Sequence, residues 1–236
     1  ADQVIRCSME LGGNAPVIVL DDANIQTAVS GIILAKMRNG GAACTSANRI
    51  FVQKGIAEEF LAAFTKAMDA FVMGRGTDQG VTLGAYVSLK ERDKIAALVD
   101  EAIKSGASVR TGGKKPDGPG AFYPATVMTV DKYNSILKHE IFGPVAPIVI
   151  FDSDEEGIAL ANDTEFGLIS YVFSGELGRA IRTAEAMESG MVAINKGVIS
   201  DPAAPFGGVK QSGLGREGGF AGIHEFLETK YNGVEI

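Results

Sequence analysis

Short apolar runs alternate with segments of helical periodicity along this chain. Residues 17–20 form an uninterrupted apolar run, which is typical of a strand that is covered on both faces. Asp21 and Asp22 then offer a helix N-cap, and apolar side chains recur at helical spacing over residues 25–36. The chain therefore opens with a predicted strand and a predicted amphipathic helix.

The same alternation continues to the end of the chain. It predicts strands at residues 4–10, 17–20, 50–52, 123–130, 145–151, 168–173, 191–194 and 226–231, with one more starting at Val109. It predicts helices at residues 25–36, 56–71, 89–104, 154–162 and 177–187. Strands that alternate with helices of this length indicate an α/β fold with a mostly parallel sheet. We find no internal repeat and no linker that would divide the chain.

Composition narrows the class of protein. The 236 residues fit one large domain, or one and a half, and a hydrophobic content of 46% excludes a disordered chain. Glycine accounts for 30 residues, which indicates many tight turns and close backbone approaches. The net charge of -7, with basic residues scattered along the chain, argues against a nucleic-acid surface.

The cysteine count and the hydropathy indicate in which cellular compartment we expect the protein. Two cysteines, Cys7 and Cys44, are too few for a disulfide framework and favour a reducing environment. No apolar run approaches the roughly 18 residues of a membrane span, and the N-terminus has no charged-then-apolar leader. We expect a cytoplasmic protein, or a fragment of one, without a membrane partner.

Cys44 is the first candidate for chemistry. It follows the small residues 40–43 and precedes the predicted strand at 50–52. Small residues let backbone N–H groups approach a carbonyl that the thiol attacks, and they leave room for a substrate. A buried cysteine in a small-residue turn explains the same pattern, because free cysteine is among the most buried residue types. The local sequence leaves both interpretations open.

Reactive cysteines need a base and a nearby positive charge. Only two histidines exist, His139 and His224, in unrelated contexts, so we expect neither a metal site nor a Cys–His hydrolase. Glu10, at the end of a predicted strand, can deprotonate a water or a thiol, although it can also merely cap a turn. Arg38, six residues before Cys44, is a local cation, or a solvated arginine at a helix end.

Five ordered blocks resemble those of the aldehyde dehydrogenase superfamily. They are residues 10–16 (ELGGNAP), 41–49 (GAACTSANR), 140–144 (EIFGP), 162–168 (NDTEFGL) and 205–217 (PFGGVKQSGLGRE). Five blocks in order make a specific signal, unlike a single glycine motif. The resemblance covers residues 1–236 as the C-terminal half of a full-length member. It implies a catalytic domain with three α/β/α layers around a mostly parallel sheet, and the oxidation of an aldehyde.

The resemblance also implies roles for single residues. Cys44 would attack the aldehyde carbon to give a thiohemiacetal, which passes a hydride to NAD or NADP and becomes a thioester. Glu10 would activate the water that hydrolyses the thioester, and the backbone N–H of Cys44 would form part of the oxyanion hole. Glu140 would hold the nicotinamide ribose, and Phe142 would pack near the nicotinamide. Phe206 would line the substrate pocket.

Two further blocks, residues 190–200 and 210–218, are most similar to the succinate-semialdehyde dehydrogenase branch of the family. In that branch an Arg and a Ser at the positions of Arg38 and Ser200 bind the substrate carboxylate. A guanidinium gives bidentate, charge-assisted hydrogen bonds to a carboxylate. The resemblance thus implies an ω-carboxylate aldehyde as substrate, of open chain length, because one methylene is worth only about 1–3 kcal/mol of discrimination.

The chain departs from the family pattern at several positions. Ala42 and Ala43 replace the usual Gln and Thr, His139 replaces an acidic residue, and residues 84–86 read Gly-Ala-Tyr where Gly-Pro-Leu is common. These changes can loosen the active-site loop and weaken the enzyme. Ser46 stands where the mammalian form has a second cysteine, so we predict no thiol-redox switch in this loop.

The resemblance places the nucleotide-binding domain in an N-terminal half that these 236 residues do not include. We therefore expect the chain alone to fold but to oxidise aldehydes poorly or not at all. The choice between NAD and NADP depends on that half. The predicted strand at 226–231 would extend the sheet of a neighbouring copy, which implies a homo-oligomer.

Two other functions remain open at this point. Cys44 and Glu10 form a pair that can hydrolyse activated esters without a cofactor, as in a thiol esterase. A non-catalytic oligomerisation or binding module would keep the terminal strand and an inert cysteine.

Overall fold

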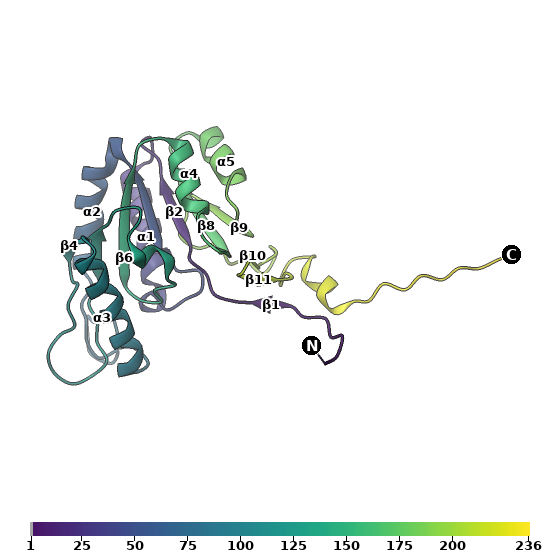
Figure 1. Cartoon of the computed structure of the whole chain (residues 1–236), viewed down its shortest axis with the longest axis horizontal. Coiled ribbons are helices and arrows are strands. Elements are labelled where there is room, and N and C mark those ends of the chain that lie inside the picture. Colours follow the sequence, from purple (N-terminus) through teal and green to yellow (C-terminus); the bar gives the residue numbers. More distant parts are fainter. Residues whose placement is uncertain (1) are drawn as a thin grey trace.

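The apolar runs of the sequence form the centre of a seven-stranded sheet in the computed structural model, which describes residues 2–236 (Figure 1). Its strands are β2 (Pro16–Val19), β3 (Arg49–Gln53), β4 (Ser108–Thr111), β5 (Thr126–Thr129), β6 (Val145–Phe151), β8 (Ile169–Phe173) and β9 (Met191–Ile194). Their order is β4-β5-β6-β3-β2-β8-β9, and neighbours are parallel except for the antiparallel edge pair β4–β5. The predicted mostly parallel sheet is confirmed.

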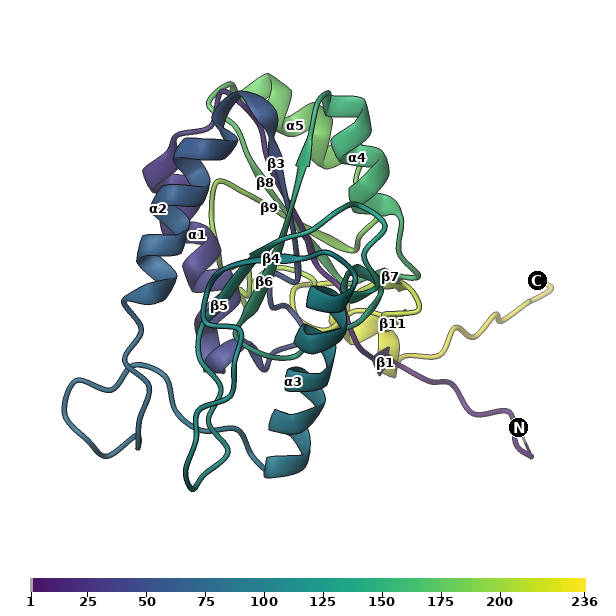
Figure 2. The same ribbon diagram turned by 60° about the vertical axis from the view of Figure 1, so that its left-hand side comes forward.

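Helices cover both faces of this sheet. The described residues form α1 (Ile25–Met37), α2 (Ala57–Asp69), α3 (Leu89–Lys104), α4 (Asp154–Asn162) and α5 (Leu177–Glu185). Val17 and Val19 of β2 pack into the core under α1 and α2, whereas Ile18 points into the core under α3, α4 and α5. This alternation follows from the period of two of a strand, and it gives the three-layer α/β/α arrangement (Figures 1 and 2).

Side chains cap the N-termini of α1, α3, α4 and α5 but not that of α2, and the cap of α1 differs from the prediction. The N-cap of α1 is Asn24, whose Oδ1 accepts from the N–H of Thr27 at 2.9 Å, and not Asp21 or Asp22. Those two carboxylates bind the guanidinium of Arg179 instead. The expected cap at Asp21–Asp22 is therefore wrong, because both side chains form ion pairs with Arg179 at the end of β2.

Two small antiparallel pairings lie beside the sheet. They join β1 (Met9–Glu10) to β11 (Gly213–Leu214) and β7 (Phe166–Gly167) to β10 (Val209–Lys210). The described chain also contains four short 3-10 helices: η1 (Arg38–Gly41), η2 (Lys54–Ile56), η3 (Ser135–Lys138) and η4 (Gly222–Phe226). The C-terminal block of the sequence thereby returns to its N-terminal segment.

The two ends of the chain differ from expectation. The strand predicted at 4–10 forms only over Met9–Glu10, where β11 supplies hydrogen-bond partners. The strand predicted at 226–231 is wrong: its first residue belongs to η4, and residues 227–236 run outward as an extended tail without a strand partner among residues 2–236 (Figure 1). An isolated strand has no neighbour for its backbone N–H and C=O groups, so residues 4–8 and 227–231 form no ladder.

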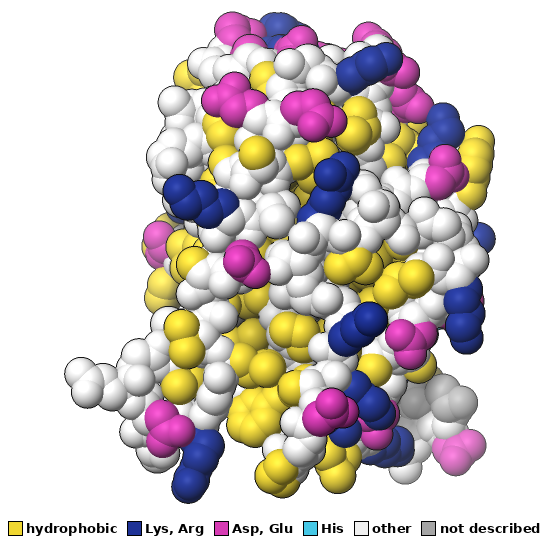
Figure 3. Space-filling view, turned by 90° about the vertical axis from the view of Figure 1, so that its left-hand side faces the viewer, with side chains coloured by type: hydrophobic (Ala, Val, Ile, Leu, Met, Phe, Trp, Pro, Cys, Tyr) yellow, Lys and Arg dark blue, Asp and Glu magenta, His cyan; other side chains and the backbone are white. Residues whose placement is uncertain are grey.

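The surface is polar with apolar patches. On the side of the molecule that carries α2 and α3, hydrophobic side chains gather around a hollow in the lower half (Figure 3). None of the helices built from residues 2–236 has both the length and the apolar composition that a bilayer crossing requires.

Candidate active site

The predicted site residues lie where the parallel strands begin. The turn after Glu10 leads into β2, Cys44 precedes β3, and Glu140 and Phe142 precede β6. Because parallel strands start at the same edge of a sheet, residues far apart in sequence meet there. Open α/β sheets usually bind ligands at the opposite, carboxyl edge. In this chain that edge is closed by an ion-pair cluster around Arg179, formed by Asp21, Asp22 and Asp154.

Backbone geometry brings Cys44 against the turn that follows Glu10. Helix α1 ends at Met37, and Asn39 and Gly40 then adopt left-handed backbone angles with φ of 52° and 62°. This sharp turn delivers Cys44, which is half-buried, to the edge of the sheet. A Cβ on Gly13 would lie 2.5 Å from the carbonyl oxygen of Cys44, so only glycine permits this approach.

Several groups act on the Cys44 thiol. Burial raises the pKa of the thiol above its usual value, and the backbone N–H groups of Cys44 and Thr45 oppose this shift. The negative charges of Glu10 and Glu140 raise the pKa further. Both carboxylates therefore lie close enough to act on the thiol electrostatically, and the structure brings Cys44, Glu10 and Glu140 together.

Residues of the C-terminal block 205–217 hold Glu10 in position. It pairs with Gly213 across β1 and β11, and the hydroxyl of Ser212 donates to the carbonyl oxygen of Gly12 at 2.7 Å. Partial burial raises the pKa of the Glu10 carboxyl, and a hydrogen bond and like charge from Glu217 raise it further. A carboxylate with a raised pKa is a stronger base, which suits the activation of a water molecule.

Glu140 and Phe142 flank a tight turn. One carboxylate oxygen of Glu140 accepts from the N–H of Gly13 at 2.9 Å, which joins the loop before β6 to the turn before β2. Phe142 has a φ of 57°, which is rare for a residue with a side chain, and it is 44% exposed. A strained backbone that keeps an aromatic ring exposed is typical of a ligand contact.

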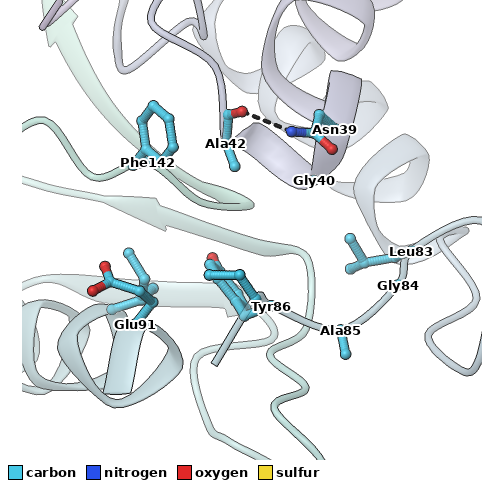
Figure 4. A pocket seen from close by; sticks show the side chains of 11 residues that line it. Asn39, Gly40, Ala42, Leu83, Gly84, Ala85, Tyr86, Glu91 and Phe142 are labelled. Carbon is cyan, nitrogen blue, oxygen red and sulfur yellow. Dashed lines mark hydrogen bonds between the residues drawn. The ribbon is translucent and has the colours of Figure 1, made fainter. Parts of the chain in front are cut away.

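The Phe142 ring lies on the wall of a pocket of about 450 Å³. Ala42, Tyr86 and Glu91 also line it, and Figure 4 shows the ring across the pocket from Tyr86 and Glu91. On the same side as the ring, the amide of Asn39 donates to the carbonyl oxygen of Ala42 at 2.9 Å (Figure 4). The pocket thus adjoins the loop that carries Cys44.

Arg38 and Ser200 line one small pocket, together with Thr45 and Tyr171. The guanidinium of Arg38 donates to the hydroxyl of Thr45 at 3.2 Å. The Tyr171 hydroxyl donates to the carbonyl oxygen of Thr45 at 2.7 Å. The residue next to the cysteine therefore ties the arginine to the site, and Ser200 approaches from the loop after β9.

Phe206 lies in a neighbouring pocket of about 150 Å³, lined also by Met191 and Asp201. Ile199 belongs to the walls of both this pocket and the one that contains Arg38. Phe206 and Cys44 pack against the same core cluster. The structure therefore places Phe206 beside the Arg38 pocket and not within it.

Three residues of the site were not predicted from the sequence: Thr45, Tyr171 and Glu217. Thr45 adjoins Cys44, so a hydrogen-bonding role for its hydroxyl could have been predicted from its position. Tyr171 reads as one more apolar position of a buried strand, and Glu217 as one more charge of a polar loop. Within residues 2–236, no three His, Cys, Asp or Glu side chains are grouped so that they could hold a metal ion.

Comparison with known proteins identifies relatives over almost the whole chain. Residues 1–232 match the sequence model of the aldehyde dehydrogenase family. A succinate-semialdehyde dehydrogenase from Paenarthrobacter nicotinovorans is 52% identical over 98% of this chain and 52% of its own length. A probable succinate-semialdehyde dehydrogenase [NADP(+)] from Sinorhizobium fredii is 47% identical over 98% of this chain and 47% of its own.

A solved structure supports the same relationship. Succinate-semialdehyde dehydrogenase from Burkholderia pseudomallei superposes with a TM-score of 0.91 and is 46% identical, over 94% of this chain and 46% of that one. The chain thus spans about half the length of the relatives that it matches.

Proposed function

Since this chain belongs to the aldehyde dehydrogenase family, we propose that it is the catalytic half of an NAD(P)-dependent enzyme that oxidises succinate semialdehyde or a similar ω-carboxylate aldehyde. One observation carries the proposal. Arg38 and Ser200 line a pocket with Thr45, the residue directly after Cys44. A cation and a hydroxyl thus lie beside the residue that follows the half-exposed thiol, which suits a substrate with an aldehyde at one end and a carboxylate at the other. The names of the relatives support this class of substrate.

Cys44 is the proposed nucleophile. The thiol loses its proton to Glu10 or to water, and the sulfur forms a bond with the aldehyde carbon to give a thiohemiacetal. The backbone N–H of Cys44, which acts to lower the pKa of the thiol, would also stabilise the oxyanion that forms. Loss of a hydride to NAD(P)+ and of the hydroxyl proton would convert the thiohemiacetal into a thioester. Glu10, with its raised pKa, would then take a proton from the water that hydrolyses this thioester to the carboxylic acid and the free thiol.

Two residues of the loop before β6, Glu140 and the pocket-lining Phe142, fit the nicotinamide end of a dinucleotide. The second carboxylate oxygen of Glu140 has no hydrogen-bond partner among residues 2–236 and can accept from a ribose hydroxyl. The exposed ring of Phe142 offers a flat apolar surface for the nicotinamide. When bound, NAD(P)+ supplies the hydride acceptor that the oxidation requires. We propose that residues outside these 236 bind its adenosine end.

We also propose that the C-terminal tail pairs with a second copy of the chain. Residues 227–236 are extended and exposed, and β9 lies at the edge of the sheet without a second neighbour among the described residues. Leu227, Tyr231 and Val234 expose large apolar side chains along the tail. Light scattering would show a dimer or larger oligomer, and removal of residues 227–236 would give monomers.

Nucleotide reduction tests the proposed activity. We would compare the chain alone with the chain fused to the N-terminal half of the Paenarthrobacter relative, using succinate semialdehyde and either NAD+ or NADP+. We expect turnover in the fusion, a much lower rate in the chain alone, and at least a 10³-fold loss on Cys44→Ser, on the order of other nucleophile removals.

Other outcomes would identify the competing functions. Hydrolysis of p-nitrophenyl acetate that depends on Cys44, without nucleotide reduction in the fusion, would indicate a thiol esterase. A Cys44 thiol of ordinary reactivity that does not respond to Glu10→Gln would indicate a non-catalytic module.

A further inference from the structure

Asn48 ties together the two loops that carry the carboxylates of the site. Its side chain is 3% exposed and uses both ends. The amide nitrogen donates to the Asn14 side-chain oxygen at 2.6 Å and to the His139 carbonyl oxygen at 2.7 Å. The amide oxygen accepts from the N–H of Ile141 at 3.3 Å. Asn48 thus holds the residue before Glu140 and the residue after it.

Asn14 extends this connection to the turn that follows Glu10. Its side-chain nitrogen donates to the carbonyl oxygen of Leu137 at 2.8 Å, and its own carbonyl oxygen accepts from Arg49 at 3.0 Å. Asn14 is itself buried. The neighbouring Gly13 donates its N–H to the Glu140 carboxylate. The turn before β2 and the loop before β6 are therefore joined directly, by the bonds of Asn14 and Gly13, and also through Asn48, which contacts both.

Asn48 is also only four residues after Cys44, on the segment that carries the nucleophile into β3. We propose that Asn48 is a positioning residue, which fixes the Glu10 turn and the Glu140 loop relative to the Cys44 thiol and so sets the reactivity of that thiol. This role deepens the proposed function, and it concerns the thiol rather than the overall reaction.

The surroundings of the thiol explain why positioning matters. Glu10 and Glu140 are the carboxylates that act on Cys44, and Arg38 and Tyr171 both bind Thr45 next to it. Coulomb interactions fall with distance, so a shift of the Glu140 loop changes the charge that the sulfur experiences. Because Asn48 is buried and satisfied at both ends, no water can replace its three contacts without rearrangement.

The chain provides a matched control for this tie. Asn162 makes the same kind of connection between the end of α4 and the segment after α5: its side-chain nitrogen donates to the Ala186 carbonyl oxygen at 2.8 Å, and its side-chain oxygen accepts from the Glu188 N–H at 2.9 Å. Loss of either asparagine removes a loop tie, but only loss of Asn48 releases residues beside Glu140. A purely structural role would give both variants the same consequences.

The experiment measures the rate at which iodoacetamide alkylates Cys44 as a function of pH. It uses the whole chain with Cys7→Ser, so that a single thiol reacts, and mass spectrometry confirms the modified residue. Each of Asn48→Ala and Asn162→Ala is measured with and without Glu140→Gln. Glutamine keeps an oxygen that can accept from Gly13, so this change removes charge and preserves the contact.

We expect Glu140→Gln to move the alkylation profile to lower pH in the reference chain, because a negative charge beside the thiol is removed. In the Asn48→Ala background the same change should move the profile by less than half as much. In the Asn162→Ala background the full shift should remain. Asn48→Ser, which keeps one donor, should give an intermediate shift, and it takes the place of Asn48→Ala if that variant does not fold.

An unchanged Glu140→Gln shift in a folded Asn48 variant would overturn the proposal, as would an equal reduction in the Asn162 variant. Neither aldehyde nor nucleotide is present in these measurements. Failure of the proposed oxidation would appear as absent nucleotide reduction in the unsubstituted fusion, and the two results can therefore be separated.

Discussion

Phe206 and Glu217 are bonded to each other in both directions through the backbone. The N–H of Phe206 donates to the Glu217 carbonyl oxygen at 2.6 Å, and the N–H of Glu217 donates to the Phe206 carbonyl oxygen at 2.8 Å. This pairing closes the C-terminal glycine-rich loop and places the Glu217 carboxyl within hydrogen-bonding reach of Glu10. After burial, a residue of the last sequence block thus contributes to the raised pKa of a carboxylate in the first.

Glu217→Gln should therefore lower the pKa of Glu10. The change removes a like charge beside Glu10, while the backbone pairing with Phe206 does not depend on the side chain. Carbon-13 NMR of labelled glutamate side chains would follow the titration of Glu10, with Glu10→Gln to assign its signal. Substitution of the exposed Glu58 is the matched control. A Glu10 titration that does not move, or that moves equally on Glu58→Gln, would contradict this expectation.

Arg38→Leu should weaken the use of a carboxylate substrate selectively. Loss of the guanidinium removes charge-assisted hydrogen bonds worth about 1.5–3 kcal/mol, or roughly 10–100-fold in kcat/KM for succinate semialdehyde. Butanal, which has no carboxylate, should be oxidised at an unchanged rate. Arg38→Lys keeps the charge but not the planar fork, so it should recover only part of the loss.

The measurement is nucleotide reduction in the fusion described above, with both aldehydes. An equal loss with succinate semialdehyde and butanal would show that Arg38 supports the Cys44 loop, through its bond to Thr45, and does not recognise the carboxylate.

Most of the sheet and its helices could be predicted from the sequence. The bounds of α3 and α4 agree with the prediction, because a serine caps each helix and its apolar positions recur at helical spacing. The ends of the chain could not be predicted in the same way. Whether residues 4–10 and 226–231 form strands depends on a neighbour, and a local pattern does not reveal one.

The site, like the ends of the chain, could be predicted from local sequence patterns only in part. The small residues around Cys44 and the glycine pair after Glu10 marked where chemistry could occur, and the family resemblance joined them. The contacts of Asn48 with Asn14 and His139 are long-range hydrogen bonds between polar side chains and loops. The periodicity of the sequence does not predict such contacts, because they depend on which loops the strand order brings to one edge of the sheet.

Arg49→Met should destabilise the fold. The buried guanidinium donates to the carbonyl oxygens of Asn14, Leu160 and Ala161 and so joins the turn before β2 to the end of α4. Methionine fills similar space but leaves these buried acceptors without donors, at a cost of about 2–4 kcal/mol. Urea unfolding would measure the loss. The exposed Arg75 supplies a control, since Arg75→Met should change stability by less than about 0.5 kcal/mol.

Lys36→Met should stabilise the fold, and most strongly at low pH. Lys36 lies on the inner face of α1, is fully buried, and its Nζ has no hydrogen-bond partner among the described residues. Burial lowers the pKa of this amine to about 7. Below that pH the folded protein must hold an unpaired buried charge, whereas the unfolded chain binds the proton at the ordinary, higher pKa.

The sign of the effect follows from this difference. Between the folded pKa near 7 and the unfolded value of 10.5, the unfolded state binds the additional proton, so the free energy of unfolding rises with pH. Methionine removes this slope. Urea unfolding of Lys36→Met should therefore show a gain of roughly 2–4 kcal/mol below pH 7 that shrinks towards pH 10, given about 1.4 kcal/mol for each pKa unit and some relaxation around the charge. Lys66→Met, at an exposed position of α2, should change neither the stability nor its pH dependence. A stability gain on Lys36→Met that is independent of pH would show that the Lys36 amine is not charged in the folded protein.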